Sequence, residues 1–253
     1  MTLQNLLSYT RRACEDYDMI SSGDVIAVGV SGGKDSLALL TALKAMEGFY
    51  PKKYRTCAVT VDMGFENADY SEISRYCDEL GVEFILVKTE LKKLIFDVRK
   101  EHNPCALCSK MRKGALVNAC AARGITKIAL GHHMDDVIET FFLNLMRGGR
   151  IDTFSPVTHL SRSGVTVIRP LVYVPEKKIV AFASKNPLPI SKAVCPADKK
   201  TEREEIKKLI NDLCVNNRDL KSKVFGAIKR AGLGGFRDEK EPGNGEKSSE
   251  RST

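Results

Sequence analysis

The sequence predicts an α/β fold in which a parallel sheet is covered by helices on both faces. Strand-like and helix-like segments alternate along the chain, and the strand-like segments are nearly continuous apolar runs, as buried parallel strands are. A glycine-rich turn separates the first apolar run from the helical pattern after it, which is where such folds bind ligands. With 253 residues, of which 43% are hydrophobic, the chain can form one large core.

The order of the expected elements follows from hydrophobic periodicity. Apolar runs predict strands over residues 25–30, 55–62, 82–87 and 125–130. Helical periodicity predicts helices over residues 2–18, 67–80, 137–145, 176–184, 206–213 and 220–231, with two more after Ser36 and from Ser109. We expect a single domain over residues 1–236, with its last helices packed on the sheet edge. The tail at residues 237–253 is rich in Glu, Lys, Ser and Gly and is expected to be disordered.

Charge and hydropathy narrow the class of protein. The net charge of +8 predicts a surface that attracts polyanions, although positive charge alone is weak evidence for nucleic acid binding. No apolar run approaches the length of a membrane span, and the N-terminus lacks the basic and then apolar layout of a signal peptide. We therefore expect a cytoplasmic protein without membrane association, in which eight cysteines do not indicate a disulfide scaffold.

The glycine-rich turn after the first strand is the most informative segment. It has the sequence Ser31-Gly32-Gly33-Lys34-Asp35-Ser36. Its glycines let the backbone approach a ligand, and the unpaired N–H groups and the dipole of the following helix favour an anion. The turn differs from a Walker A loop, because Val28 and Asp35 stand where that loop has Gly and Ser or Thr. A carboxylate beside phosphates is repulsive unless it holds a cation, so Asp35 predicts Mg²⁺.

This segment resembles the pyrophosphatase loop of the N-type ATP pyrophosphatases. The resemblance implies a Rossmann-like adenine nucleotide alpha hydrolase fold, in which the loop holds the phosphates of ATP while a substrate is adenylated. It assigns six residues to ATP binding: Ser31, Gly32, Gly33, Lys34, Asp35 and Ser36. Lys34 and Asp35 are also the expected catalytic residues.

Two other strand ends carry candidate nucleotide-binding residues, because ligands of parallel sheets bind at the carboxyl ends of strands. Asp62 and Met63 end the second strand and are candidates for the adenosine site, while a turn or helix-capping carboxylate is an equally good interpretation of Asp62. After the strand at 125–130, contacts to nucleotide are expected from Gly131, His132 and Asp135. The alternative is that Asp135 and the neighbouring Asp136 cap the next helix.

Three cysteines are candidate metal ligands. Cys105 and Cys108 form a C-x₂-C pair, expected on a loop that leads into a helix. Thiols at a helix N-terminus have depressed pKa values, so the pair alone is compatible with zinc, an iron–sulfur cluster, a redox disulfide or a persulfide carrier. Cys195 precedes a proline, which fits a ligand loop rather than a helix interior. His102 could complete a Cys₃His zinc site with these thiols.

Several motifs together resemble those of the tRNA 2-thiocytidine synthetases. They lie at residues 105–114, 130–136, 144–149 and 169–171, within a resemblance that runs from about residue 23 to 213. The resemblance implies a [4Fe–4S] cluster on Cys105, Cys108 and Cys195, a tRNA anticodon loop as substrate, and a possible homodimer. One departure is that Pro-Ala-Asp follows Cys195, where that family has a further cysteine.

The reaction implied by the resemblance is ATP- and Mg²⁺-dependent thiolation. A cytosine C2 oxygen would be adenylated and then replaced by sulfur, which a cysteine desulfurase or free sulfide would supply. Two alternatives stay open: another ATP-dependent modification of a tRNA base or small molecule, and a non-catalytic protein that binds zinc and nucleotide. Bound iron with acid-labile sulfide would favour thiolation, whereas zinc without sulfide would favour the last alternative.

Overall fold

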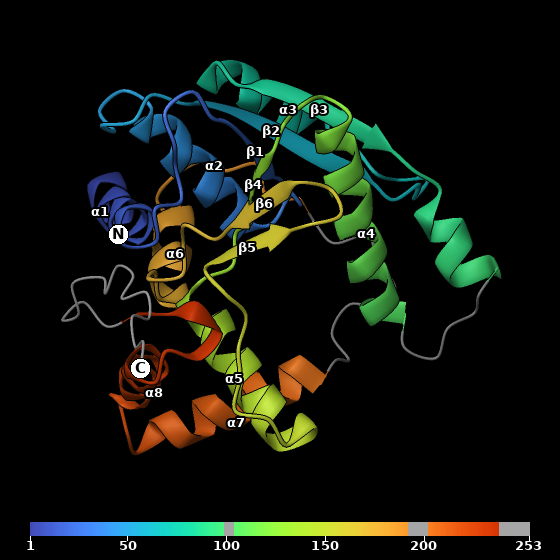
Figure 1. The fold of residues 1–253 in the computed structure, drawn as a ribbon. Coiled ribbons are helices and arrows are strands. Elements are labelled where there is room, and N and C mark those ends of the chain that lie inside the picture. Colours follow the sequence, from blue (N-terminus) through green and yellow to red (C-terminus); the bar gives the residue numbers. More distant parts are fainter. Residues whose placement is uncertain (99–103, 192–201, 238–253) are drawn as a thin grey trace, which may run out of the picture.

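The centre of the molecule is a six-stranded sheet with the order β3-β2-β1-β4-β6-β5 (Figure 1). The fold is that of a computed structural model, which describes residues 1–98, 104–191 and 202–237. Five strands are parallel, and β5 runs antiparallel to β6 at one edge. The strands are β1 Val25–Gly29, β2 Arg55–Asp62, β3 Glu83–Lys88, β4 Lys127–Ala129, β5 Val157–Leu160 and β6 Val165–Ile168.

The four predicted strands are confirmed, but the β5–β6 hairpin was not predicted. Each of its strands has only four residues, which is too short for an alternating pattern to stand out from a loop. Two of the hairpin's partner pairs are Val157 with Ile168 and Leu160 with Val165. The sheet is therefore mixed rather than wholly parallel, as open α/β sheets with an antiparallel edge strand often are.

The part of the chain that the structure describes contains eight α-helices. They are α1 Leu3–Asp16, α2 Lys34–Met46, α3 Ser71–Leu80, α4 Pro104–Ala121, α5 Met134–Gly148, α6 Glu176–Ala183, α7 Glu202–Val215 and α8 Leu220–Arg230. A π-helical segment, η1, spans Lys93–Val98, and a 3₁₀ turn, η2, spans Leu233–Gly235.

Two helices begin elsewhere than the sequence predicted. The predicted helix over 67–80 starts only at Ser71, because the Asp69 carboxylate accepts hydrogen bonds from the Ser71 N–H at 2.9 Å and from its hydroxyl at 3.0 Å. The prediction that a helix begins near Ser109 is also wrong, since α4 begins at Pro104. Proline suits the first turn of a helix, where its missing N–H would have no partner anyway.

Helices cover both faces of the sheet, as predicted (Figure 1). Neighbouring residues of one strand face opposite sides: Ile26 and Val28 of β1 join a core with α1, α2 and α6, whereas Ala27 joins a second core with α4. On the second face, α4 contributes the buried side chains of Leu116, Val117 and Cys120. A sheet that is buried on both faces explains the continuous apolar runs in the sequence.

The last two helices do not pack on the sheet edge, contrary to expectation. Both α7 and α8 pack against α5 and against each other, below the sheet in Figure 1. Ile206 and Ile210 form the buried stripe of α7, but Leu213 of the predicted stripe is 46% exposed. Of the predicted tail, residues 238–253 lie outside the described part of the chain. Within the described ranges no helix has both the length and the apolar character that crossing a membrane requires.

Candidate functional site

The glycine loop connects β1 to α2 and leaves the helix N-terminus open for a ligand. Gly33 is the N-cap residue of α2 and offers no side chain that could occupy the first backbone N–H groups. Gly32 has a φ of +81°, a left-handed conformation that favours glycine. Ser36 braces the turn, because its hydroxyl donates to the Gly33 carbonyl at 2.9 Å and accepts from the Ser31 N–H at 3.2 Å. The loop is thus a preformed anion-binding turn.

Gly131 presses directly against this loop from the neighbouring strand. β1 and β4 are paired in parallel, so the segments that follow them meet at the same end of the sheet. A Cβ atom on Gly131 would lie 3.0 Å from the Asp35 carbonyl carbon and 3.0 Å from the Ser36 nitrogen. A side chain at this position would require one of the two backbones to shift, so the loop and the segment after β4 lie in close contact.

Lys34 lies between two carboxylates. Its Nζ donates to Asp35 Oδ2 at 3.1 Å and to Glu176 Oε1 at 3.1 Å. Burial by itself would lower the pKa of Lys34, but these two carboxylates outweigh burial and raise it. The ammonium group is therefore charged and is held at the mouth of the loop, where it can neutralise an anionic ligand.

Asp35 has one oxygen without a partner. Its Oδ2 receives the Lys34 hydrogen bond, whereas its Oδ1 is buried and accepts no hydrogen bond in the described part of the chain. The imidazole Nε2 of His133 lies 3.8 Å from Oδ1, which is too far for a hydrogen bond. An unsatisfied buried carboxylate oxygen is costly, so this atom is suited to a cation.

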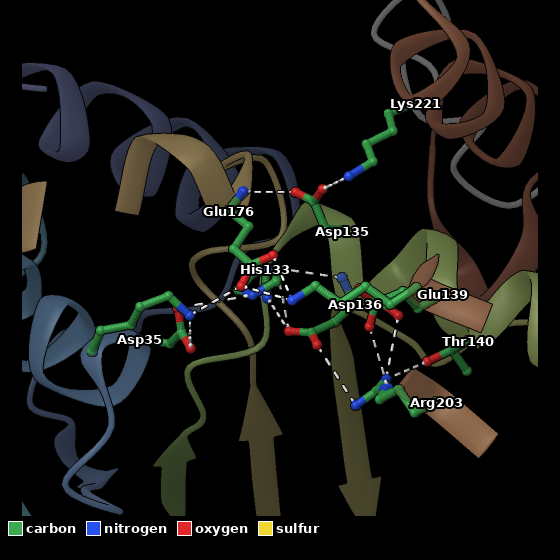
Figure 2. A network of polar contacts seen from close by, with 11 residues as sticks. Asp35, His133, Asp135, Asp136, Glu139, Thr140, Glu176, Arg203 and Lys221 are labelled. Atoms are coloured by element: carbon green, nitrogen blue, oxygen red, sulfur yellow. Dashed lines mark hydrogen bonds and ion pairs between the residues drawn. The ribbon is translucent and has the colours of Figure 1, made fainter. Parts of the chain in front are cut away.

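The acidic pair after β4 stabilises helix starts. His133 is the N-cap of α5 and accepts from the Asp136 N–H at 3.3 Å, and Asp136 accepts from the His133 N–H at 2.9 Å (Figure 2). Asp135 Oδ2 accepts from the N–H of Glu176, the first residue of α6, at 2.6 Å, and its Oδ1 pairs with Lys221 of α8 at 2.9 Å. The capping alternative therefore holds for Asp136, and both oxygens of Asp135 already have protein partners.

His132 packs against Phe154. The two ring centroids are 5.2 Å apart, and the Arg169 guanidinium lies 5.1 Å from the same Phe154 ring. Burial lowers the pKa of His132 to about 4, so the imidazole is neutral at pH 7. Its Nδ1 and the Arg169 Nε are buried without a partner in the described part of the chain. These two atoms are therefore available as hydrogen-bonding groups.

Asp62 and Met63 lie at the carboxyl end of β2, as predicted, but each has structural contacts. Asp62 Oδ1 accepts from the Gly64 N–H at 2.9 Å and from the Tyr70 hydroxyl at 3.3 Å, which is the turn role named above as an alternative. Met63 is 7% exposed and packs with Leu91 and Ile95. Their contact with adenosine stays a prediction.

Of the candidate cluster ligands, Cys108 lies beside a small apolar cluster. Because α4 begins at Pro104, the backbone of Cys105 and Cys108 belongs to its first helical turns rather than to a loop. Residues three apart on a helix share a face, so the two cysteines are placed to act together. The Cys108 side chain is half-buried and packs against the cluster that contains Met63. Cys195 and His102 lie outside the described residues.

Sequence reasoning missed the contacts of Glu176, Arg203 and His133. Arg203 of α7 lies 3.6 Å from Asp136 and 3.4 Å from Glu139, and it donates to the Thr140 hydroxyl at 2.8 Å (Figure 2). Glu176 and Arg203 come from helices far along the chain, and no local pattern distinguishes them from surface charges. His133 could have been found, because it occupies the residue before a helix that carries a carboxylate three positions later.

Glu139 gives a testable pH dependence of stability. Burial, followed by the charge of Asp136, raises its pKa to about 7, so the folded protein holds a proton that the unfolded chain releases near pH 4.5. Stability from this group is present below pH 4.5 and is lost as the pH rises towards 7. We expect Glu139→Gln to raise the free energy of unfolding at pH 8 by about 1–3 kcal/mol and not at pH 4. Urea unfolding at both pH values tests this, and an equal effect at both would contradict it.

Comparison with known proteins identifies the family to which this chain belongs. Residues 6–213 match a family described as the PP-loop domain. A tRNA-cytidine(32) 2-sulfurtransferase from Citrifermentans bemidjiense is 35% identical over 222 residues, 86% of this chain and 86% of that protein. One from Bordetella petrii is 36% identical over 229 residues, 90% of this chain and 71% of the relative. Among solved structures, the fold is similar to that of the U34-tRNA thiolase NcsA from Methanococcus maripaludis with its [4Fe-4S] cluster. The TM-score is 0.73 at 23% sequence identity, and the match covers 90% of this chain and 79% of that chain.

Proposed function

Because the chain belongs to the tRNA-cytidine(32) 2-sulfurtransferase family of PP-loop proteins, we propose that it thiolates cytosine in a tRNA anticodon loop at the expense of ATP. In the first step the cytosine C2 oxygen attacks the α-phosphorus of ATP, and pyrophosphate leaves. In the second step sulfide attacks C2, the C2–O bond breaks, and AMP leaves with the oxygen. The product is 2-thiocytidine. The observation that carries the proposal is the open helix N-terminus at Gly33, with Lys34 beside it.

ATP binding is the best supported part of the proposal. The backbone N–H groups of the loop and the Lys34 ammonium would bind the β- and γ-phosphates and stabilise the charge that develops on leaving pyrophosphate. Gly131 lets the loop and the β4 end stand close enough to form one wall of the site. The candidates for contacts to the rest of the nucleotide remain Asp62, Met63, His132 and Asp135. Both carboxylate oxygens of Asp135 already have protein partners, so Asp135 would bind the nucleotide in addition to them or in place of one of them.

The residues at the loop also fit a magnesium ion. Mg²⁺ is usually bound by one or two carboxylates together with phosphate oxygens and water, rather than by a cage of protein ligands. Asp35 Oδ1 is a buried carboxylate oxygen without a partner beside the expected phosphates, and no group of three or more candidate ligands occurs among the described residues. Asp35 would therefore be the main protein ligand, and the ion would neutralise the phosphates that the loop holds.

The cysteines fit an iron–sulfur cluster by their chemistry. Cys105 and Cys108 stand on one face of α4, close to a helix N-terminus that favours thiolates, and Cys195 would be the third ligand. A cluster held by these three thiolates would supply the chemistry of sulfur delivery. The sulfur would come from a cysteine desulfurase or from free sulfide.

The substrate side of the proposal rests on charge. The chain carries a net charge of +8, which favours association with a polyanion such as tRNA. A base in an anticodon loop is already partly unstacked, so presenting its C2 oxygen to the nucleotide costs less than extracting a base from a duplex. A homodimer and a cytoplasmic location are part of the same proposal.

The test is mass spectrometry of tRNA nucleosides from cells that lack this gene, with and without the gene restored. We expect 2-thiocytidine to disappear on deletion and to return on complementation, with no change in other thiolated nucleosides. Complementation with a Lys34→Met variant is expected to restore less than about 1% of the wild-type level, because the phosphates lose their main cation. An unchanged 2-thiocytidine level in the deletion strain would contradict the proposal.

A further inference from the structure

Glu176 connects the glycine loop to α7. Its Oε1 accepts from Lys34 of the loop at 3.1 Å and from Lys207 of α7 at 3.0 Å, and its Oε2 lies 2.9 Å from Lys207. All three side chains are partly buried, with exposed fractions of 27% for Lys34, 19% for Glu176 and 33% for Lys207. Two cations thus share one carboxylate, in surroundings where charge pairs are stronger than at an open surface.

The position of Glu176 is fixed from the backbone side. Its N–H donates to Asp135 Oδ2 at 2.6 Å, and Asp135 is paired in turn with Lys221 of α8 (Figure 2). Burial alone would raise the pKa of Glu176, but the hydrogen bonds from Lys207 and Lys34 outweigh it and lower the pKa to about 2. The carboxylate is therefore ionised and anchored, and it contacts both Lys34 and Lys207.

A second chain of contacts joins the same two elements. Arg203 of α7 pairs with Asp136, Asp136 forms the capping box with His133, and His133 faces Asp35 of the loop (Figure 2). The helix α7 follows the segment that carries Cys195 in the sequence. The loop and α7 are therefore connected by two sets of polar contacts, one through Glu176 and the other through Asp136 and His133.

We propose that Glu176 is a positioning residue that couples ATP binding at Lys34 to the placement of α7 through Lys207. The phosphates of ATP compete with Glu176 for the Lys34 ammonium. As Lys34 turns to the phosphates, Glu176 keeps Lys207 as its remaining cation, and their pairing tightens. Coupling of this kind is reciprocal, so removing Lys207 changes the affinity for ATP. The inference rests on the proposed function only in taking ATP as the ligand of the loop.

The experiment measures the dissociation constant of ATP by calorimetry, in the presence of Mg²⁺, for variants made in two backgrounds. In the wild-type background, Lys207→Met is expected to weaken ATP binding by about 3- to 10-fold, because Lys34 is then the one cation left to Glu176 among the described residues and Glu176 competes harder with the phosphates. In the Glu176→Gln background the same substitution is expected to change the affinity by less than about 2-fold. The matched control is Lys208→Met, which removes a neighbouring exposed lysine of α7 and is expected to have no effect in either background.

Hydrogen exchange supplies a readout of α7 itself. ATP is expected to slow exchange of the α7 amides in the wild type and in Lys208→Met, and to leave them unchanged in Lys207→Met. If Lys207→Met weakened ATP binding equally in both backgrounds, its effect would be a general effect of charge. If it did not weaken ATP binding in the wild-type background, the loop and α7 would not be coupled. Either result would overturn the inference. Failure of the wild-type protein to bind ATP would instead overturn the proposed function, so the two failures are distinguishable.

Discussion

Replacement of Cys108 by alanine is expected to reduce formation of 2-thiocytidine by more than about 100-fold while the affinity for ATP changes by less than about 2-fold. The physical reason is that Cys108 and the glycine loop lie on different elements, α4 and the β1–α2 turn. In the proposed function this substitution removes one of three cluster ligands, whereas Lys34 and the loop amides are untouched. The measurements are nucleoside analysis after an anaerobic reaction with purified tRNA, and calorimetry with ATP.

The matched control is Cys214→Ala. Cys214 lies on α7 and is half-buried like Cys108, but it is not a candidate ligand. We expect this variant to retain iron, acid-labile sulfide and thiolation at wild-type levels, and Cys108→Ala to lose iron together with activity. Full thiolation by Cys108→Ala would rule out the cluster mechanism. Zinc without sulfide in the wild-type protein would favour the zinc-binding alternative.

The second large effect is expected from Gly131→Ala. The added Cβ would lie 3.0 Å from backbone atoms of Asp35 and Ser36, and backbone cannot move aside as a flexible side chain can. Overpacking of this kind costs about 1–3 kcal/mol, so displacement of the loop should weaken ATP binding by roughly 10- to 100-fold. Calorimetry with ATP measures the effect, and thermal unfolding shows whether the variant is folded.

Gly114→Ala is the control for this prediction. Gly114 lies inside α4, and a Cβ added there meets no atom within 4 Å. Alanine is the better helix former, so we expect unchanged ATP affinity and a gain in stability of up to about 1 kcal/mol. Unchanged ATP binding in a folded Gly131→Ala variant would mean that the β4 end does not support the loop. Such a result would leave the assignment of Lys34 intact.

The two large predictions probe different parts of one reaction. In the proposed function Cys108 serves sulfur delivery and Gly131 supports the nucleotide site, so one variant should separate thiolation from ATP binding and the other should impair both. The coupling through Glu176 adds a third measurable property, since the loop and α7 are connected although their residues lie far apart in the sequence.

The sequence alone determined the features that depend on short segments. Apolar runs predicted four of the strands, and the order strand, glycine turn and helix predicted the anion-binding loop at residues 31–36. The pair of Cys105 and Cys108 was visible from spacing, although its place inside α4 was not, because a proline after Asn103 reads equally as a break and as a first helical residue. These features are local, so neighbouring residues were enough to predict them.

Only the tertiary structure decided which distant charges meet. The short hairpin of β5 and β6 joins the sheet because β6 pairs with β4, and its sequence shows no strand periodicity of its own. The apolar stripes of α7 and α8 pack on α5 and not on the sheet edge. Asp135 binds the start of α6 and Lys221, and Glu176 bridges Lys34 and Lys207. Charge pairing depends on distance in space, and a distance between residues more than a hundred positions apart is set by packing of the whole domain.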